Sequence, residues 1–203
     1  MIFVALGRRE TGPGHASQPE TGALRGYIMR VMTRELLILR HAKSAWDTGA
    51  PTDFERPLSE RGQSAAPRVG RFLFEKGLVP DFVVSSPAER AKQTVMAVCA
   101  QMDLGPETIH WDDRIYGGWT SSLMSVLRES PPDAHRVLIA GHNPGLEGLL
   151  EHLCEQRVPY SSDGKMLPTA ALAHLLIRPG WDELDRGCAE LLSITRSRSL
   201  TDY

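Results

Sequence analysis

Two arginines and two histidines stand at or just beyond the ends of short apolar segments in this 203-residue sequence. Arg40 and His41 directly follow one such segment, Arg90 comes shortly after a second, and His142 comes just after a third. A guanidinium group matches phosphate oxygens bidentately and stays charged at any working pH. An unprotonated imidazole can attack phosphorus. The four residues therefore predict a site that binds a phosphoryl group and transfers it to a histidine.

His41 stands directly beside Arg40, and a nearby positive charge disfavours the protonated form of an imidazole. We expect His41 to be neutral near pH 7 and to form a covalent phosphohistidine, while His142 hydrogen-bonds the equatorial oxygens. The arginines can stabilise the charge of a transferring phosphoryl group, so the sequence predicts neither a metal nor another cofactor. Taken singly, each residue could instead be a surface charge or a structural histidine.

Short strands must alternate with helices to bring these residues together. Because open α/β sheets bind ligands outside the carboxyl ends of their strands, we expect the four side chains to converge there. The pattern predicts an α/β fold with a largely parallel sheet and helices on both faces. Pro67 is expected to kink or divide its helix. The expected strands are 35–39, 82–84, 136–140 and 171–177, and the expected helices follow Ser59, Pro87 and Pro144 or lie around 123–127.

Five blocks of the sequence carry a family resemblance. They are LRHAKS (39–44), DFERPLSERG (53–62), SSPAERAKQT (85–94), GHNPGLEGL (141–149) and LPTAALAHL (167–175). In this order they resemble the histidine phosphatase, or phosphoglycerate-mutase-like, superfamily and its SixA-like phosphohistidine phosphatases. The resemblance implies a three-layer sandwich with a mostly parallel central sheet. It also implies that His41 is the nucleophile, Arg40 and Arg90 clamp the phosphate, and His142 is the second pocket histidine. Ala42 replaces the glycine of the more usual Arg-His-Gly signature.

Four further residues are candidates for the site, each with an alternative. Ser44 could hydrogen-bond the phosphate or cap the next turn. Arg56 could rim the pocket or fix the start of the following helix. Asn143 could contact substrate, although we favour a role in capping the helix that follows it. Asp113 is the candidate general acid, or part of a solvated turn, and the turn is the favoured interpretation for Asp112.

The leading functional hypothesis is a metal-independent phosphatase that works through a covalent intermediate on His41. No clear acid motif is present, which favours phosphohistidine proteins as substrates, because a phosphoramidate can leave as an imidazole with less help. One alternative is a phosphatase of a small phosphate ester that uses Asp113 as the acid. Another is a catalytically silent phosphate-binding module. A mutase reaction ranks below these.

Composition restricts the partners. With 23 basic and 25 acidic residues, the formal charge is −2 and there is no long basic block, which argues against nucleic acid and anionic membrane as partners. No apolar stretch is long enough to span a bilayer. Cys99, Cys154 and Cys188 lie far apart without metal-ligand spacing, which indicates a reducing cytoplasm. We expect a phosphorylated protein or a small phosphorylated substrate.

The first part of the chain differs from the rest. Residues 7–26 are rich in glycine, proline, serine and threonine and have almost no apolar periodicity. We therefore predict a flexible N-terminal extension at 1–33 and one histidine phosphatase domain at 34–203. A later translation start at Met29 or Met32 is an alternative explanation of the extension.

Overall fold

The computed structural model describes residues 33–155, 158–160 and 164–200. The predicted extension at 1–33 lies outside these ranges except for Thr33. The strands and helices alternate through most of the described chain. They are β1 (Arg34–Arg40), α2 (Glu60–Glu75), β2 (Phe82–Ser85), α3 (Glu89–Ala100), η1 (Pro106–Thr108), β3 (Ile109–Trp111), η2 (Asp113–Ile115), α4 (Thr120–Arg128), β4 (Arg136–Gly141), α5 (Gly145–Leu153), β5 (Ala171–Ile177), β6 (Ala189–Arg196) and η3 (Ser197–Ser199).

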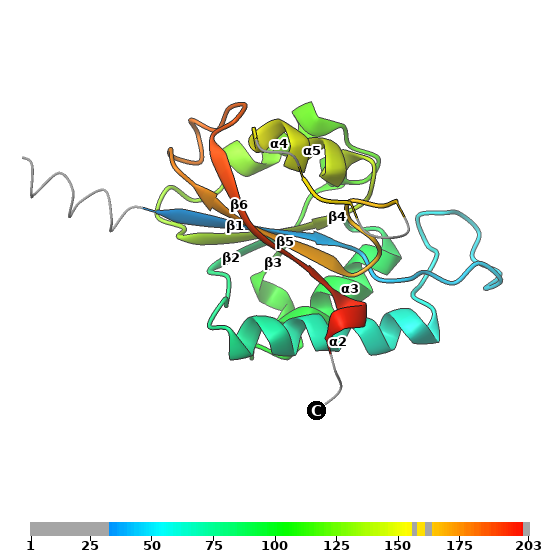
Figure 1. The fold of residues 1–203 in the computed structure, drawn as a ribbon. Helices are drawn as coiled ribbons and strands as arrows, with labels where there is room; N and C mark the ends of the chain where they lie inside the picture. Colours follow the sequence, from blue (N-terminus) through cyan, green and yellow to red (C-terminus); the bar gives the residue numbers. More distant parts are fainter. Residues whose placement is uncertain (1–32, 156–157, 161–163, 201–203) are drawn as a thin grey trace, which may run out of the picture. The chain divides into compact units, whose positions relative to one another are not determined.

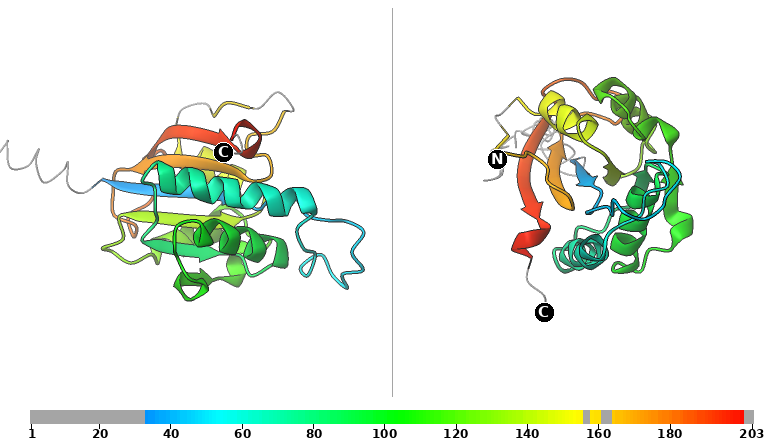
Figure 2. Two further views of the ribbon diagram at one scale, coloured as in Figure 1. Left: turned by 90° about the horizontal axis from the view of Figure 1, so that it is seen from below. Right: turned by 90° about the vertical axis from the view of Figure 1, so that its right-hand side faces the viewer.

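One six-stranded sheet forms the middle layer, in the order β3-β2-β4-β1-β5-β6. The first four strands in this order are parallel, whereas β5 runs antiparallel to both of its neighbours, β1 and β6. Helices α2 and α3 cover one face and α4 and α5 cover the other (Figures 1 and 2). The sheet is mostly parallel and lies between two helical layers, so the predicted fold class is confirmed.

The central strand β1 explains why its sequence is a continuous apolar run. Leu37 and Leu39 belong to the core that α2 and α3 cover, and Leu36 and Ile38 belong to the core under α4 and α5. Neighbouring residues of a strand point to opposite faces, so a strand covered on both sides needs apolar residues at every position. This burial fixes β1 firmly and gives the residue that follows it a rigid support.

Helix α2 begins as predicted but is not divided. The Ser59 side chain accepts a hydrogen bond from the Gly62 amide, which confirms the predicted cap. The helix then runs unbroken through Pro67, so Pro67 does not divide it, and the alternative of a kink stays a prediction. Its buried face packs on α3 and outweighs the lost backbone hydrogen bond. A Cβ on Gly62 would lie 2.2 Å from the Lys43 carbonyl oxygen, so glycine is needed where α2 meets the segment after His41.

The four predicted strands are confirmed, but two strands were not predicted. β3 has only three residues, and β6 is a half-exposed edge strand without a clean alternation. Within the described ranges, no helix combines the length and the apolarity required to cross a bilayer.

Candidate active site

The ends of two neighbouring strands bring the predicted histidines together. β1 and β4 pair in register, with Arg40 opposite Gly141. The His41 amide donates a hydrogen bond of 3.0 Å to the Gly141 carbonyl oxygen. The rings of His41 and His142 follow, with their centroids 5.0 Å apart. The right-hand view of Figure 2 looks towards this end of β1.

Hydrogen bonds on both sides hold the segment around His41. Its carbonyl oxygen accepts from the Ala170 amide at 3.1 Å, and the Ala42 amide donates to Thr94 Oγ1 at 2.9 Å. The Thr94 hydroxyl donates in turn to the Arg90 carbonyl, one turn earlier on α3, at 2.6 Å. Thr94 therefore links the His41 segment to the helix that carries Arg90.

The ring of His41 has a defined tautomer. Its Nδ1 lies 2.7 Å from the Ala42 carbonyl oxygen. A carbonyl oxygen can only accept a hydrogen bond, so Nδ1 carries the ring proton. Nε2 therefore keeps its lone pair and is the ring atom that can attack phosphorus.

Burial and positive charge keep both imidazoles neutral at ordinary pH. Burial lowers the pKa of His41 to about 4, and nearby guanidinium groups, Arg90 foremost, add to the effect. Burial also lowers the pKa of His142 to about 3, with further lowering by His41. Sequence reasoning expected a neutral His41 because of neighbouring charge, but burial is the larger cause.

We predict that the two imidazoles stay unprotonated in the free protein well below pH 6.5, the ordinary histidine pKa. The unfolded chain takes up these protons between pH 6.5 and 4 while the folded protein does not, so stability falls as the pH falls through this window. The shifted pKa of His41 lowers the free energy of unfolding by about 2 kcal/mol at pH 5. A proton–carbon NMR titration of the histidine rings checks the pKa values directly. A midpoint near 6.5 for the His41 ring would contradict the prediction.

Ser86 determines which nitrogen of His142 is open. His142 Nε2 lies 2.9 Å from Ser86 Oγ, and this oxygen already accepts from the Ala88 amide at 3.3 Å. The arrangement favours a hydroxyl proton that points to Nε2, which places the ring proton on Nδ1. Nδ1 is buried and has no partner among the described residues. It is therefore able to donate to a phosphoryl oxygen.

Asp53 connects two arginines beside the histidines. Arg90 donates from Nη1 to the Asp53 backbone carbonyl at 2.5 Å and from Nη2 to Asp53 Oδ2 at 2.9 Å. Arg56 Nη2 lies 2.7 Å from Oδ1, and the Tyr116 hydroxyl donates to Oδ2 at 3.2 Å. Burial acts to raise the pKa of Asp53, but Arg90 and Arg56 outweigh it and hold the pKa below its ordinary value. The carboxylate is thus kept ionised.

The two arginines retain donors for a ligand. Arg90 Nε, Arg56 Nε and Arg56 Nη1 are buried and have no partner in the described part of the chain. The Arg56 guanidinium also lies over the Trp46 ring, with 3.9 Å between its central carbon and the ring centroid. Arg56 therefore belongs to the same cluster as Arg90, where its charge also acts on His41.

We predict that Asp53→Asn lowers kcat/KM about tenfold and leaves the shape of the pH profile unchanged. The amide keeps the size of the side chain but loses the charge-assisted bonds that orient Arg90 and Arg56. An ionised carboxylate has no proton to donate, so no limb of the profile depends on it. Steady-state rates across pH check both points, and loss of an acid limb would show that Asp53 is a general acid.

The Leu167 carbonyl oxygen anchors Arg40 and Asn143. It accepts from Arg40 Nη1 at 2.7 Å and from Asn143 Nδ2 at 3.0 Å. The favoured capping role of Asn143 is wrong, because Pro144 is the N-cap of α5 and there is no side-chain capping bond. The side-chain amide of Asn143 donates to the Leu167 carbonyl oxygen instead. Arg40 Nε and Asn143 Oδ1 are buried without a partner among the described residues, so both remain available to a ligand.

The other two candidates differ in their surroundings. Ser44 is buried and forms an isolated bridge with Leu58, next to the start of α2. Asp113 is exposed in η2, and within the described ranges its carboxylate has no hydrogen bond or ion pair with a pocket residue. Asp112 caps η2 and pairs with Arg114, as expected of a turn residue. The structure thus groups Arg56 and Asn143 with the histidines but does not connect Asp113 to them.

Sequence reasoning missed four residues of the cluster: Asp53, Ser86, Thr94 and Tyr116. The Tyr116 ring lies edge-on to His142, with the centroids 5.5 Å apart. Thr94 stands four residues after Arg90, on the same helix face, which is a signal that spacing could have given. Ser86 directly follows β2, so its position at a strand end was a signal that could have found it. Asp53 and Tyr116 reach the site through loops, where periodicity gives no guidance.

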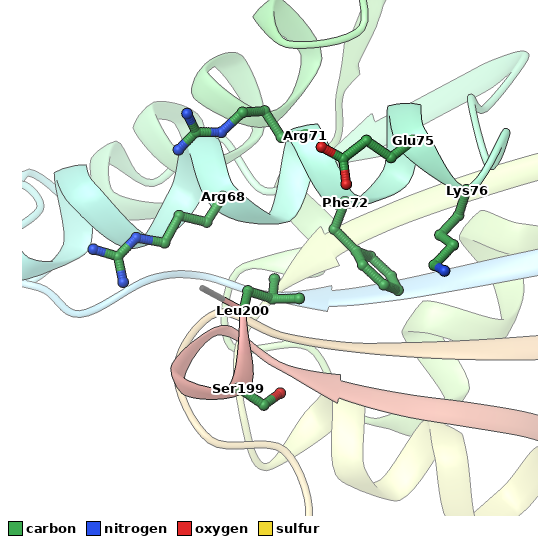
Figure 3. A pocket seen from close by; sticks show the side chains of 7 residues that line it. All are labelled: Arg68, Arg71, Phe72, Glu75, Lys76, Ser199 and Leu200. Carbon is green, nitrogen blue, oxygen red and sulfur yellow. The ribbon is translucent and has the colours of Figure 1, made fainter. Parts of the chain in front are cut away.

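A separate hollow lies between α2 and η3 (Figure 3). Its charged lining residues are Arg68, Arg71, Glu75 and Lys76. The described residues that line it include no histidine or cysteine. Nowhere in residues 33–155, 158–160 and 164–200 do three or more His, Cys, Asp or Glu side chains form a group that could hold a metal ion.

The sheet order and the flanking helices define a phosphoglycerate-mutase-like fold. The family model of the histidine phosphatase superfamily (branch 1) matches residues 36–158, and the chain belongs to that superfamily. The structure of a proposed phosphohistidine phosphatase SixA from Agrobacterium tumefaciens superposes with a TM-score of 0.68 and 26% identity, covering 80% of this chain and 97% of that one.

Two curated relatives match over part of their length. An uncharacterized chloroplast protein of Arabidopsis thaliana is 33% identical over 124 residues, which are 57% of each chain. A 2,3-bisphosphoglycerate-dependent phosphoglycerate mutase of Bifidobacterium longum is 43% identical over 113 residues, 53% of this chain and 46% of the mutase. The matches therefore span about half the length of these two relatives.

Proposed function

We propose that the chain is a metal-independent phosphatase that acts through a covalent phosphohistidine on His41. The observation that carries the proposal is the state of this ring, which is buried and neutral, and whose Nε2 lone pair is free. Arg40, Arg56 and Arg90 supply the positive charge that the transferring phosphoryl group needs. The chemistry requires no other group to activate the nucleophile.

The reaction has two steps. The Nε2 lone pair of His41 forms a bond to phosphorus while the bond from phosphorus to the leaving group breaks. The Nδ1 proton stays on the ring, hydrogen-bonded to the Ala42 carbonyl, and stabilises the positive charge that the ring acquires. Water then attacks phosphorus and releases inorganic phosphate and neutral His41. His142 donates from Nδ1 to a phosphoryl oxygen in both steps.

The state of Asp53 supports a phosphohistidine protein as the substrate. An ester releases an alkoxide, which needs a proton from a general acid, but the carboxylate that touches Arg90 and Arg56 is held ionised. Phosphohistidine can take a proton from water on its remote ring nitrogen and then leave as neutral imidazole. An ionised Asp53 is therefore compatible with a phosphoramidate substrate, which needs no general acid, and less so with an ester.

The three cysteines support a reducing location. Cys99, Cys154 and Cys188 are free thiols, and burial raises the pKa of Cys99 and of Cys154 to about 11. Such thiols are poorly reactive and persist in a reducing compartment. We place the proposed activity in the cytoplasm.

A small phosphate ester is the second candidate substrate. The similarity to a phosphoglycerate mutase favours it, since that enzyme is named for a phosphate ester. On this hypothesis Asp113 must move to the pocket and donate a proton to the leaving oxygen.

The test compares phosphate release from a phosphohistidine protein and from a generic phosphate ester, with chelator present and no added metal. We expect release from phosphohistidine at least 100-fold faster (roughly the contribution of a missing general acid). A preference for the ester that is lost on Asp113→Asn would support the second candidate. Binding of phosphate without release from either substrate would indicate a silent binding module.

A further inference from the structure

A cleft lies beside the proposed site, between the beginnings of α4 and α5, which lie side by side (Figure 1). Its volume is about 320 Å³. A Cβ on Gly145 would lie 2.2 Å from the Gly118 carbonyl oxygen, so two backbone segments meet closely here. Its lining includes the side chains of Trp119, Glu147, Glu151, Tyr160 and Met166, and we call this hollow the α4–α5 cleft.

Leu167 links the α4–α5 cleft to the residues around His41. Glu147 Oε1, on the cleft side, accepts from the Leu167 amide at 2.9 Å. The carbonyl of the same residue accepts from Arg40 Nη1 at 2.7 Å, on the pocket side. Pro144, which also lines the cleft, is two residues after His142. A substrate with its phosphoryl group at His41 therefore has the cleft as a neighbouring surface.

The cleft exposes large aromatic rings. Trp119 is 73% exposed and Tyr160 is 56% exposed. Tryptophan is mostly well buried in proteins, and exposed aromatic residues grouped in a hollow are typical of contact surfaces with a partner. Among the described residues, neither ring belongs to a hydrophobic core cluster or packs against one.

The charge of the cleft is opposite to that of the pocket. Glu147 and Glu151 are the charged residues among the described ones that line the cleft, and both are negative. The adjoining pocket holds Arg40, Arg56 and Arg90. Carboxylates beside exposed aromatic rings attract a lysine or arginine side chain, whose ammonium or guanidinium pairs with the acid and whose stem packs on the ring.

We propose that the α4–α5 cleft is a subsite for a lysine- or arginine-bearing segment of the phosphorylated protein substrate, next to the phosphohistidine. This inference rests on the proposed function. The positive pocket takes the phosphoryl group while the negative, aromatic cleft takes the neighbouring basic residue. The chain would then select among phosphohistidine proteins by the charge around the modified residue.

The experiment uses two synthetic phosphohistidine peptides that differ only in flanking lysines or flanking glutamates, with phosphoramidate as the small substrate. We compare kcat/KM for the two peptides, each normalised to phosphoramidate hydrolysis by the same variant. We expect the wild-type protein to prefer the lysine peptide about fivefold, the size of one partly shielded ion pair. Glu151→Lys should abolish the preference through KM, and Trp119→Ala should raise KM for the lysine peptide about tenfold.

The matched control is Asp133→Lys, which makes the same charge change at an exposed carboxylate before β4, near the opposite end of that strand from His142. It should leave the preference unchanged. Equal rates for the two wild-type peptides, or equal effects of Glu151→Lys and Asp133→Lys, would overturn the proposal. So would a clear preference for a small phosphate ester with an amino group, such as phosphoserine, because the cleft would then serve a small molecule.

A binding measurement separates this inference from the proposed function. The lysine peptide with unmodified histidine is titrated into the protein, and tryptophan fluorescence is followed. If no substrate is hydrolysed but this peptide binds and Trp119→Phe removes the response, the proposed function fails and the basic-segment site stands. If phosphohistidine is hydrolysed without charge preference and the peptide does not bind, the subsite fails and the proposed function stands.

Discussion

His41→Ala should abolish phosphate release from phosphohistidine, with a loss of kcat on the order of 10⁴-fold. The variant removes the Nε2 lone pair that accepts the phosphoryl group in the proposed reaction, and no other described side chain in the pocket has a comparable free nucleophile. His142 cannot replace it, because the Ser86 hydroxyl occupies its Nε2. Single-turnover measurement of phosphate release with excess enzyme checks the chemical step separately from product release.

Two controls make the His41 result specific. His135→Ala removes an exposed imidazole before β4 and should leave the rate unchanged. His41→Asn keeps a polar side chain at the position, and its thermal unfolding midpoint shows whether the fold survives. A residual rate within tenfold of wild type in a folded His41 variant would show that another group carries the phosphoryl group.

Arg90→Ala should lower kcat/KM about 10³-fold, the effect expected from loss of a guanidinium that stabilises a transferring phosphoryl group. Arg90 is 6% exposed and sits in the first turn of α3, where Asp53 fixes two of its nitrogens. The kcat/KM of Arg90→Lys should be only about tenfold higher than that of Arg90→Ala, because an ammonium group lacks the planar fork of a guanidinium. Both kcat and KM should change, since the charge acts on bound substrate and more strongly on the transition state.

The control for Arg90 is Arg71→Ala, which removes an exposed arginine from α2. Calorimetric binding of inorganic phosphate provides a second measurement for each variant. Arg90→Ala should bind phosphate at least tenfold more weakly than wild type, while Arg71→Ala should bind it equally well. Equal phosphate binding by Arg90→Ala and wild type would mean that Arg90 does not contact the phosphoryl group.

Much of this arrangement was predictable because it depends on strand ends. Arg40, His41 and His142 follow continuous apolar runs, and such runs identify buried parallel strands. The carboxyl ends of neighbouring parallel strands meet at one edge, so the residues beyond them must lie close together. The same signal was absent for β6, whose residues are mostly half-exposed or exposed and show no clear period.

The parts that could not be predicted depend on loops. Asp53 precedes Arg90 by 37 residues and lies in the irregular segment before α2, yet its carboxylate bonds to Arg90. Asn143 has the residue type and position of a helix cap, but the nearby Leu167 carbonyl provides a better partner. Local sequence cannot rank such alternatives, because the competing partner is brought in by the tertiary fold. Burial, the main cause of the lowered pKa of His41, is also a property of the whole fold.

A phosphorylated form of the protein can be trapped to test whether His41 carries the phosphoryl group. A brief reaction with excess phosphohistidine substrate is quenched at alkaline pH, where phosphohistidine is stable, and the digested protein is analysed by mass spectrometry. We expect one phosphoryl group, on His41, that disappears when the substrate is exhausted. Phosphate release without a phosphoryl group on His41, or with one on another residue, would contradict this prediction.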